Sequence, residues 1–285
     1  SRLAYYSLDP VFFRSDKNTP THLTIDDKSN HYARQVMINE VFPNRNIQQG
    51  TPNIIPTLDL SFFPSQRGSY NFNSNATDLK SDGTFIDPKK TWGGIMRKIE
   101  TNDFQAANIA YLEFWMMDPF IYDQTNSGQL YFNLGEISED QLPDSRKSYE
   151  NGYAPDGNNT GKVDETSLGN VPILTTLNNF FDNDGSSRQN QDIGIDGMTD
   201  GEERTFWKDD YLDKVATNFG TGSKFYIDAT EDPCNDNYKY YNDPTYSDTE
   251  TGITDRYVKF NGQQGNSTDA KLSDGTSMSS TLETP

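Results

Sequence analysis

Residues 109–120 read IAYLEFWMMDPF and form the most concentrated apolar segment of a chain that is otherwise acidic and polar. In an extended conformation one face of this run carries only apolar side chains, and the other face carries one charge, that of Glu113. A strand that is apolar on both faces must be covered on both, so the run predicts a strand at the centre of a packed sheet. Asp118 and Pro119 should end it, because proline donates no hydrogen bond to the ladder and restricts the residue before it.

A second strand is predicted soon after the first. Leu130, Phe132 and Leu134 occupy alternate positions, and the polar residues 123–128 before them are typical of a hairpin loop. The chain of 285 residues is only 32% hydrophobic but 13% aromatic, with 21 glycines and 14 prolines spread along it. Aromatic residues favour strands, and scattered glycine and proline favour turns, so the composition predicts a loop-rich β protein.

The net charge of −19 limits the classes of partner. Phosphate backbones and anionic membrane surfaces would be repelled, which disfavours nucleic acid and membrane binding, whereas cations or a basic partner are compatible. Cys234 is the only cysteine, which excludes an internal disulfide and a multi-cysteine metal site. The sequence has no apolar run of transmembrane-helix length and no signal peptide, and because it begins at Ser1 amid apparent structure we expect a fragment of a longer protein.

Two helices are predicted. The stronger one begins with the capping box Thr199 to Glu202 and continues through the apolar stripe of Trp207, Tyr211 and Val215. Gly220 is a natural terminator for it. A shorter helix is predicted over residues 138–149, where another capping box opens the segment.

An acidic segment just before the stronger helix has the spacing of a calcium loop. With Asp192 as position 1, Asp196 falls at position 5, Asp200 at 9 and Glu203 at 12. Position 3, where a ligand is required, is Gly194. The acidic residues are also explained without metal, as the favourable first turn of a helix, and we prefer this interpretation while calcium stays a candidate cofactor.

No catalytic site is expected. The two histidines, His22 and His31, have no carboxylate or cysteine at ligand spacing, and no nucleophile or phosphate-binding motif occurs. Glu113 with Asp118 or Glu136 is conceivable as a glycosidase carboxylate pair, but acidic residues are so frequent that such pairs arise by chance.

A single inward Glu113 is more simply explained by a salt bridge to Arg97 or Arg146. We therefore expect no enzyme and no required cofactor. Exposed aromatic residues on a β-sandwich, among them Trp92 and Trp207, would suit a surface glycan-binding module, with or without calcium, and this is the alternative function. The alternation around Trp115 instead assigns that side chain to the core.

Several segments resemble the SprA/Sov family, the outer-membrane translocon of the type IX secretion system in Bacteroidetes. The earlier ones are RLAYY at 2–6 with DP at 9–10, TLDL at 57–60, RGSYNF at 67–72, WGGIMR at 92–97 and DF at 103–104. The later ones are YLEFWMMDPF at 111–120, LYFNLG at 130–135, ISED at 137–140, RKSYENG at 146–152 and QDIGIDG at 191–197. YVKFNG at 257–262 with GNS at 265–267 is similar to the family pattern RYKxFNGxxGNS, from which Val258 departs.

This resemblance implies a non-enzymatic domain of a giant channel that exports surface proteins and gliding adhesins. The implied partners are the rest of the SprA/Sov barrel, a PorV-type barrel protein, a plug protein and secreted client proteins. The implied location is the cell outer membrane, with this segment outside the bilayer and the cell-surface cap favoured over the periplasm. No catalytic residue is carried over from the family.

The expected architecture is mainly β, a jelly-roll-like β-sandwich with one or two short helices and long irregular extensions. Residues 1–75 should be an extended irregular segment, residues 76–232 the β-sandwich domain with a helix near 200–219, and residues 233–285 a polar, partly disordered tail. Within this tail only residues 257–260 suggest a strand.

Overall fold

The computed structural model describes residues 1–15, 17–95, 103–135, 142, 144, 146, 148, 150–173, 185–260 and 266–268. The strands are β1 (Arg2–Tyr6), β2 (Val36–Met37), β3 (Ile54–Ile55), β4 (Asp59–Phe63), β5 (Gly93–Ile95), β6 (Val163–Glu165), β7 (Asn170–Pro172) and β8 (Asn266–Thr268). The α-helices are α1 (Ile25–Ser29), α2 (Ile38–Val41), α3 (Gly185–Gln191), α4 (Asp200–Phe206), α5 (Asp213–Phe219), α6 (Lys224–Glu231) and α7 (Pro244–Asp248). A π-helix, η4 (Lys208–Leu212), joins α4 to α5, and the 3-10 turns are η1 (Pro10–Phe13), η2 (Pro88–Lys90), η3 (Glu150–Gly152) and η5 (Thr254–Tyr257).

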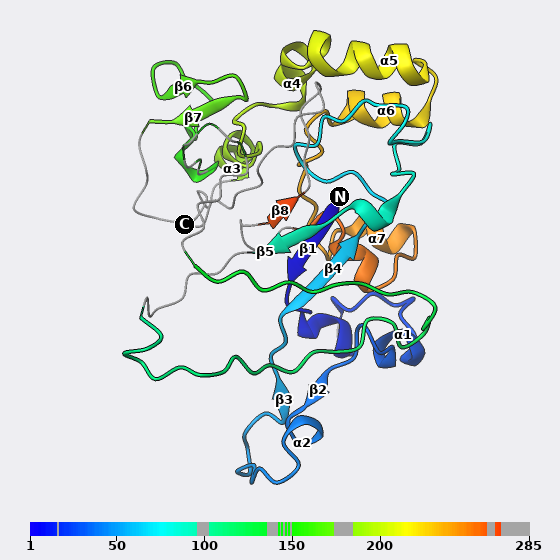
Figure 1. Ribbon diagram of the computed structural model, residues 1–285, viewed down its shortest axis with the longest axis vertical. Coiled ribbons are helices and arrows are strands. Elements are labelled where there is room, and N and C mark those ends of the chain that lie inside the picture. The colour runs from blue at the N-terminus through cyan, green and yellow to red at the C-terminus, as the bar shows by residue number, and fades with distance from the viewer. Residues whose placement is uncertain are drawn as a thin grey trace.

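One apolar cluster forms around the pair of strands β1 and β4, which run antiparallel near the middle of the molecule (Figure 1). Ala4 and Tyr6 lie on the buried face of β1, as the period of two requires. The ring of Tyr6 stacks on that of Tyr257, with centroids 4.0 Å apart. The cluster therefore joins the first strand to a turn about 250 positions later; its buried members are Ala4, Tyr6, Phe12, Leu23, Ala33, Ile253 and Tyr257.

The second cluster lies under the helices α4 to α6, at the opposite end from the β2–β3 hairpin (Figure 1). The ring of Phe72 stacks on Trp207 with centroids 3.9 Å apart, and Tyr211 meets Phe72 edge-on. The buried members of this cluster are Tyr70, Phe72, Leu79, Phe85, Leu142, Leu168, Ile195, Met198, Trp207, Tyr211, Leu212, Val215, Phe225, Ala229 and Cys234.

The stronger predicted helix is confirmed, with a π turn in its middle. Thr199 caps α4 through a complete capping box with Glu202, and Gly220 follows the last residue of α5 at φ +85°. The stripe of Trp207, Tyr211 and Val215 is buried. Local signals therefore defined this element correctly. The weaker helix at 138–149 falls mostly outside the described residues.

The mainly β, jelly-roll-like β-sandwich is wrong. In the described part of the chain the strands form four separate two-stranded sheets, and no two of these stack as a sandwich. The physical reason is visible in the second cluster, where Tyr211, Val215 and Phe225 pack from helices. A high aromatic content means that a chain can bury a large apolar area with few side chains. Helices place aromatic rings in a core as well as strands do, so this content does not by itself favour a β fold.

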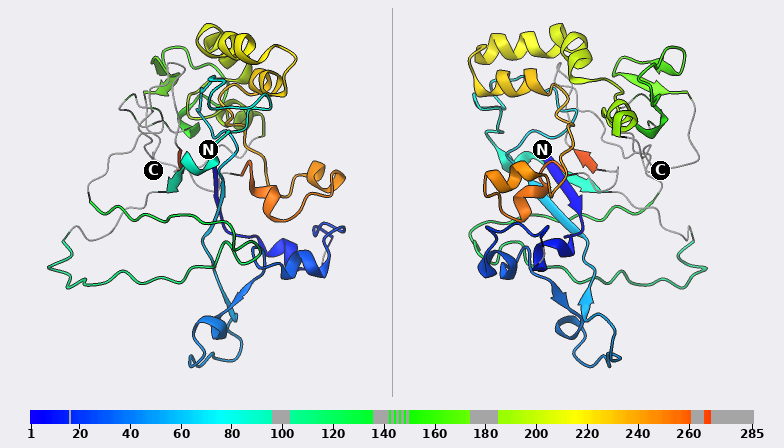
Figure 2. Two further views of the ribbon diagram at one scale, coloured as in Figure 1. Left: turned by 45° about the vertical axis from the view of Figure 1, so that its right-hand side comes forward. Right: turned by 180° about the vertical axis from the view of Figure 1, so that it is seen from behind.

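The two strands expected over 109–120 and 130–135 are also wrong, although both runs are extended. Neither belongs to a sheet, and both project from the packed body as long arms (Figures 1 and 2). Trp115, expected in the core, is 74% exposed. Tyr257 lies in η5 rather than in a strand. Among the described residues, no helix combines the length and the apolar composition needed to cross a bilayer.

Candidate metal centre

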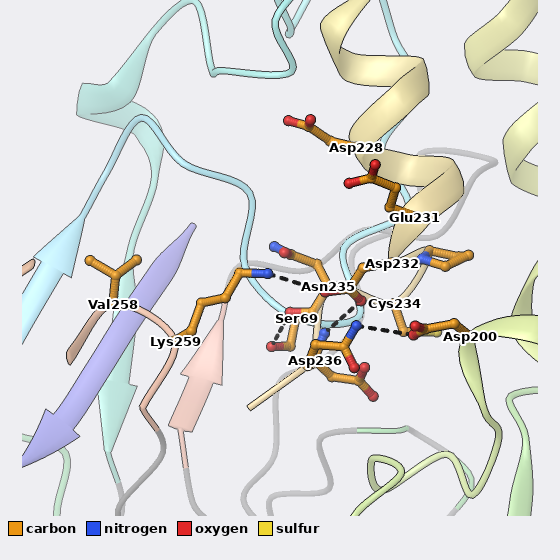
Figure 3. Close-up of polar contacts among 12 residues, drawn as sticks. Ser69, Asp200, Asp228, Glu231, Asp232, Cys234, Asn235, Asp236, Val258 and Lys259 are labelled. Atoms are coloured by element: carbon orange, nitrogen blue, oxygen red, sulfur yellow. Dashed lines mark hydrogen bonds and ion pairs between the residues drawn. The ribbon is translucent and has the colours of Figure 1, made fainter. Parts of the chain in front are cut away.

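The candidate site forms where the chain leaves α6. Residues 232–237, here called the acidic loop, lie beside Ser69, which contacts Asn235 of the loop (Figure 3). The Arg67 guanidinium donates to the carbonyl oxygens of Asp232 at 2.9 Å and Pro233 at 2.7 Å. The backbone N–H of Tyr70 donates to the Cys234 carbonyl at 2.7 Å. The acidic loop is thus fixed largely through its backbone, and the side chains of Asp232 and Cys234 are buried.

Cys234 connects two buried carboxylates. Its backbone N–H donates to Oε2 of Glu203 at 3.0 Å, and its thiol donates to Oδ2 of Asp196, also at 3.0 Å. The other oxygen of Asp196 accepts from the backbone N–H of Met198 at 3.2 Å. Asp196, Glu203 and Cys234 are each at most 1% exposed, and one ligand atom from each lies within 4.8 Å of the others.

A second group shares Glu203 with the first. One carboxylate oxygen each from Asp200, Glu203 and Asp232 lies within 4.8 Å of the others. Asp200 is partly exposed and accepts from the side-chain amide of Asn237 at 3.1 Å. Oδ2 of Asp232 is buried, receives no hydrogen bond from any described residue, and lies 3.5 Å from Nζ of Lys259.

Asp236 adds a further carboxylate on the side of Tyr70. The Tyr70 hydroxyl donates to Oδ2 of Asp236 at 2.5 Å and accepts from the backbone N–H of Ile195 at 2.9 Å. Gly194 must approach this pair closely, because a Cβ at that position would lie 2.0 Å from Oδ2 of Asp236. Its φ of +86° also favours glycine. The glycine at the third position of the calcium-like spacing is therefore explained by packing.

Burial and mutual repulsion raise the pKa values of these acids. The pKa of Glu203 is raised to about 9, first by burial and then by the charge of Asp236. The pKa of Asp236 is raised to about 7 by burial and by Asp232, and that of Asp196 is raised well above its ordinary value by burial and by Asp236. Several protons are therefore held here at neutral pH, and a bound cation would displace them.

The two groups differ in the ions that suit them. Burial raises the pKa of the Cys234 thiol well above its ordinary value, and a protonated thiol does not ligate a metal. Three carboxylate oxygens are the donors that calcium and magnesium prefer. The group of Asp200, Glu203 and Asp232 therefore fits a hard divalent cation better than the group that contains Cys234.

The structure brings together three of the four residues expected to bind calcium. Asp196, Asp200 and Glu203 all take part in these groups, whereas Asp192 belongs to neither. Sequence reasoning missed Asp232 and two further members of the acidic loop, Cys234 and Asp236. Their signal was the stretch EDPCNDN at 231–237, where the sole cysteine stands among acidic and amide residues. Calcium binding itself stays a prediction.

Comparison with protein families gives one match. Residues 210–285 match the family SprA_N, described as motility related/secretion protein. The matched residues include α5, α6 and the whole acidic loop. No curated protein matches the chain.

Proposed function

The chain is related through residues 210–285 to the SprA family of motility-related secretion proteins, and we propose that it is an extramembrane, non-enzymatic part of an outer-membrane protein translocon. The family match carries this proposal. The general part of the proposal, a role in motility or secretion, follows from the family match. The specific part of the proposal, a type IX translocon that exports surface proteins and gliding adhesins, is our inference from the motifs spread along the chain.

Contacts between residues 210–285 and the rest of the chain support extending the family relationship to residues that precede 210. The RGSYNF segment at 67–72 resembles the family and lies outside the matched residues 210–285. Three of its residues nevertheless bind the acidic loop, which lies within the matched residues. Besides the bonds from Arg67 and Tyr70, the Ser69 hydroxyl donates to the Asn235 carbonyl at 2.9 Å (Figure 3). The side-chain amide of Asn235 donates a hydrogen bond to the Arg67 carbonyl at 2.7 Å. The two segments therefore form one structural unit.

The proposed setting is the cell outer membrane, with this segment in a cell-surface cap. The proposed partners are the remainder of the barrel, a PorV-type barrel protein, a plug protein and secreted client proteins. The net charge of −19 disfavours nucleic acid as a partner.

An in-frame deletion of the segment in the native gene tests this function. Clients should accumulate inside the cells while the barrel still reaches the outer membrane, and export should return with the wild-type segment supplied in place. Protease added to intact cells should cleave the segment if it lies in the cap. Unchanged client export after the deletion would contradict the proposal. The glycan-binding alternative depended on a β-sandwich face, and the described residues contain no sandwich.

A second proposal concerns the acidic groups. We propose that a hard divalent cation, calcium first, binds between Asp200, Glu203 and Asp232, where it would compete with protons and with the Lys259 ammonium. The observation that favours it is the buried Oδ2 of Asp232, which has an ion pair but no hydrogen-bond donor among the described residues. Lys259, Arg2 and Arg204 carry positive charge near these carboxylates, yet the pKa of Glu203 is still raised to about 9, and bound calcium would offset the remaining repulsion.

Thermal unfolding with calcium titrated into EDTA-treated protein tests this site. A ligand that binds only the folded state adds about 2.7 kcal/mol at a concentration 100-fold above its Kd. The gain should disappear in Glu203→Gln and persist in Asp209→Asn, whose side chain is 89% exposed. A wild-type midpoint that does not respond to calcium would refute the site.

A further inference from the structure

Residues 109–134, here called the exposed arm, carry a dense set of uncovered apolar side chains. Tyr111 is 84% exposed and Trp115 is 74% exposed. The other large apolar side chains of the arm with more than 40% exposure are Ile109, Leu112, Phe114, Met116, Met117, Ile121, Tyr122, Leu130, Tyr131, Phe132 and Leu134. Contiguous apolar surface of this kind marks interaction sites on folded proteins.

The backbone of the exposed arm is also unpaired. Residues 110–117 and 128–134 make no backbone–backbone hydrogen bond with any described residue. The rings of Phe114 and Phe132 approach to 5.0 Å, so the two runs meet through side chains without forming a ladder. Each run therefore presents the row of free N–H and C=O groups that an edge strand offers to an incoming strand.

The tip of the exposed arm is held in place by the region around α1. The backbone N–H of His31 donates to the Tyr122 hydroxyl at 2.9 Å, and the Tyr32 hydroxyl donates to the Pro119 carbonyl at 2.9 Å. The rings of Tyr32 and Tyr122 pack edge-on at 5.2 Å. Because the tip is anchored, the extended runs have already lost part of their conformational freedom, which lowers the entropic cost of binding a partner.

The uncovered area is large enough for a specific interface. Six of the seven aromatic side chains of the arm, all but Phe120, are between 53% and 84% exposed, about two-thirds on average. Since one aromatic side chain buries ~150–250 Å², the six leave roughly 600–1,000 Å² uncovered. One partner of a standard interface contributes about 800 Å². The aromatic side chains alone therefore supply the surface of one interface partner.

The charge of the exposed arm restricts its occupant. Its ionisable side chains other than tyrosine are Glu113, Asp118 and Asp123, and it contains no lysine or arginine. A second copy of this chain would bring like charges together, each copy carrying −19, and an anionic membrane would be repelled in the same way. The complementary occupant is an apolar polypeptide strand with basic residues beside it.

We propose that the exposed arm binds such a basic, apolar strand of a second polypeptide by strand addition along residues 110–117. The backbone groups supply the ladder, the aromatic side chains cover the strand, and the acidic residues select against acidic competitors. This docking surface goes beyond the proposed secretion role and does not depend on it.

Fluorescence anisotropy with two labelled peptides tests the proposal on the full chain. The probe is a nine-residue strand of alternating valine and threonine flanked by lysines, and its twin carries glutamates instead. The lysine peptide should bind at least tenfold more tightly than its twin. Leu112→Pro should weaken binding at least tenfold, because it removes a backbone N–H that bonds to no described backbone group. Trp115→Ser should weaken it similarly, whereas Ile227→Ser, an exposed apolar change on α6, should not.

Three results would overturn this proposal. The first is no measurable binding of the lysine peptide, or equal binding of both peptides. The second is an equal loss of affinity in Ile227→Ser and Trp115→Ser, which would mean that generic stickiness explains the binding. The third is sedimentation of the peptide-free wild type as a dimer that Trp115→Ser dissociates, which would assign the surface to a second copy.

Discussion

Replacing Glu203 by glutamine should stabilise the metal-free protein at alkaline pH. Glu203 is 1% exposed, and its Oε2 accepts the Cys234 backbone N–H at 3.0 Å. The glutamine of Glu203→Gln keeps the shape of the side chain and an oxygen acceptor for that bond, but it removes the charge that appears on ionisation. The substitution therefore isolates the energetic cost of a buried carboxylate.

The size of the effect follows from the pKa of Glu203. The carboxyl has a pKa of 4.5 in an unperturbed setting and about 9 in the folded protein, so the folded state retains a proton that the unfolded state has lost. The stabilisation by this bound proton is complete below pH 4.5 and is lost as pH rises toward 9. At pH 7 the loss amounts to about 3 kcal/mol, at ~1.36 kcal/mol per pH unit. Because Asp236 shares the protons, we expect about 1–3 kcal/mol.

Urea unfolding in EDTA at pH 5 and pH 8 measures this effect. The wild type should lose stability between the two pH values, whereas Glu203→Gln should lose less and be the more stable protein at pH 8. Glu231→Gln is the matched control, since the side chain of Glu231, at the end of α6, is exposed. A Glu203→Gln protein that is less stable than the wild type at pH 8 in EDTA would refute the repulsion that we infer among these carboxylates.

Three further outcomes are expected. Gly194→Ala should destabilise the protein by at least about 2 kcal/mol in urea unfolding, because its Cβ would meet a carboxylate oxygen at 2.0 Å, whereas Gly50→Ala, at φ +89° with open space around it, should cost about 1 kcal/mol. Tyr257→Ala should cost roughly 3–5 kcal/mol, because that ring is fully buried, and the exposed Tyr111→Ala should change stability by less than about 0.5 kcal/mol. The Cys234 thiol should resist a thiol reagent at pH 8 until the protein is unfolded, because burial excludes the reagent and raises the pKa of the thiol.

The sequence predicted those elements whose determinants are local. The capping box at Thr199 and the stripe through Trp207 and Tyr211 lie within one helix, so they could be recognised without knowing the rest of the fold. The run at 109–120 was different. Its pattern correctly indicated an extended chain with two apolar faces, but a pattern does not reveal whether another strand covers them. Trp115 is exposed for that reason.

The same distinction applies to the candidate metal centre. Asp196, Asp200 and Glu203 lie within eight positions, and their spacing alone drew attention to them. Asp232 and Asp236 reach the site only because Arg67 and its neighbours fix the acidic loop against it. That contact joins segments about 165 positions apart, a separation at which the sequence alone offers no rule for pairing.

The stack of Tyr6 on Tyr257 also constrains the timing of folding. Ribosomes add ~5–20 residues per second, so the first strand leaves the ribosome about 13–50 s before the ring that completes its cluster. Arg2 also lacks its partners for that time, since it donates to the carbonyls of Asn235 and Val258. During that interval β4 pairs with β1, but the face of Tyr6 that stacks on Tyr257 lacks its partner, and uncovered apolar surface of this kind is what holdase chaperones bind. A need for chaperones during synthesis therefore follows from a cluster whose two halves lie about 250 positions apart.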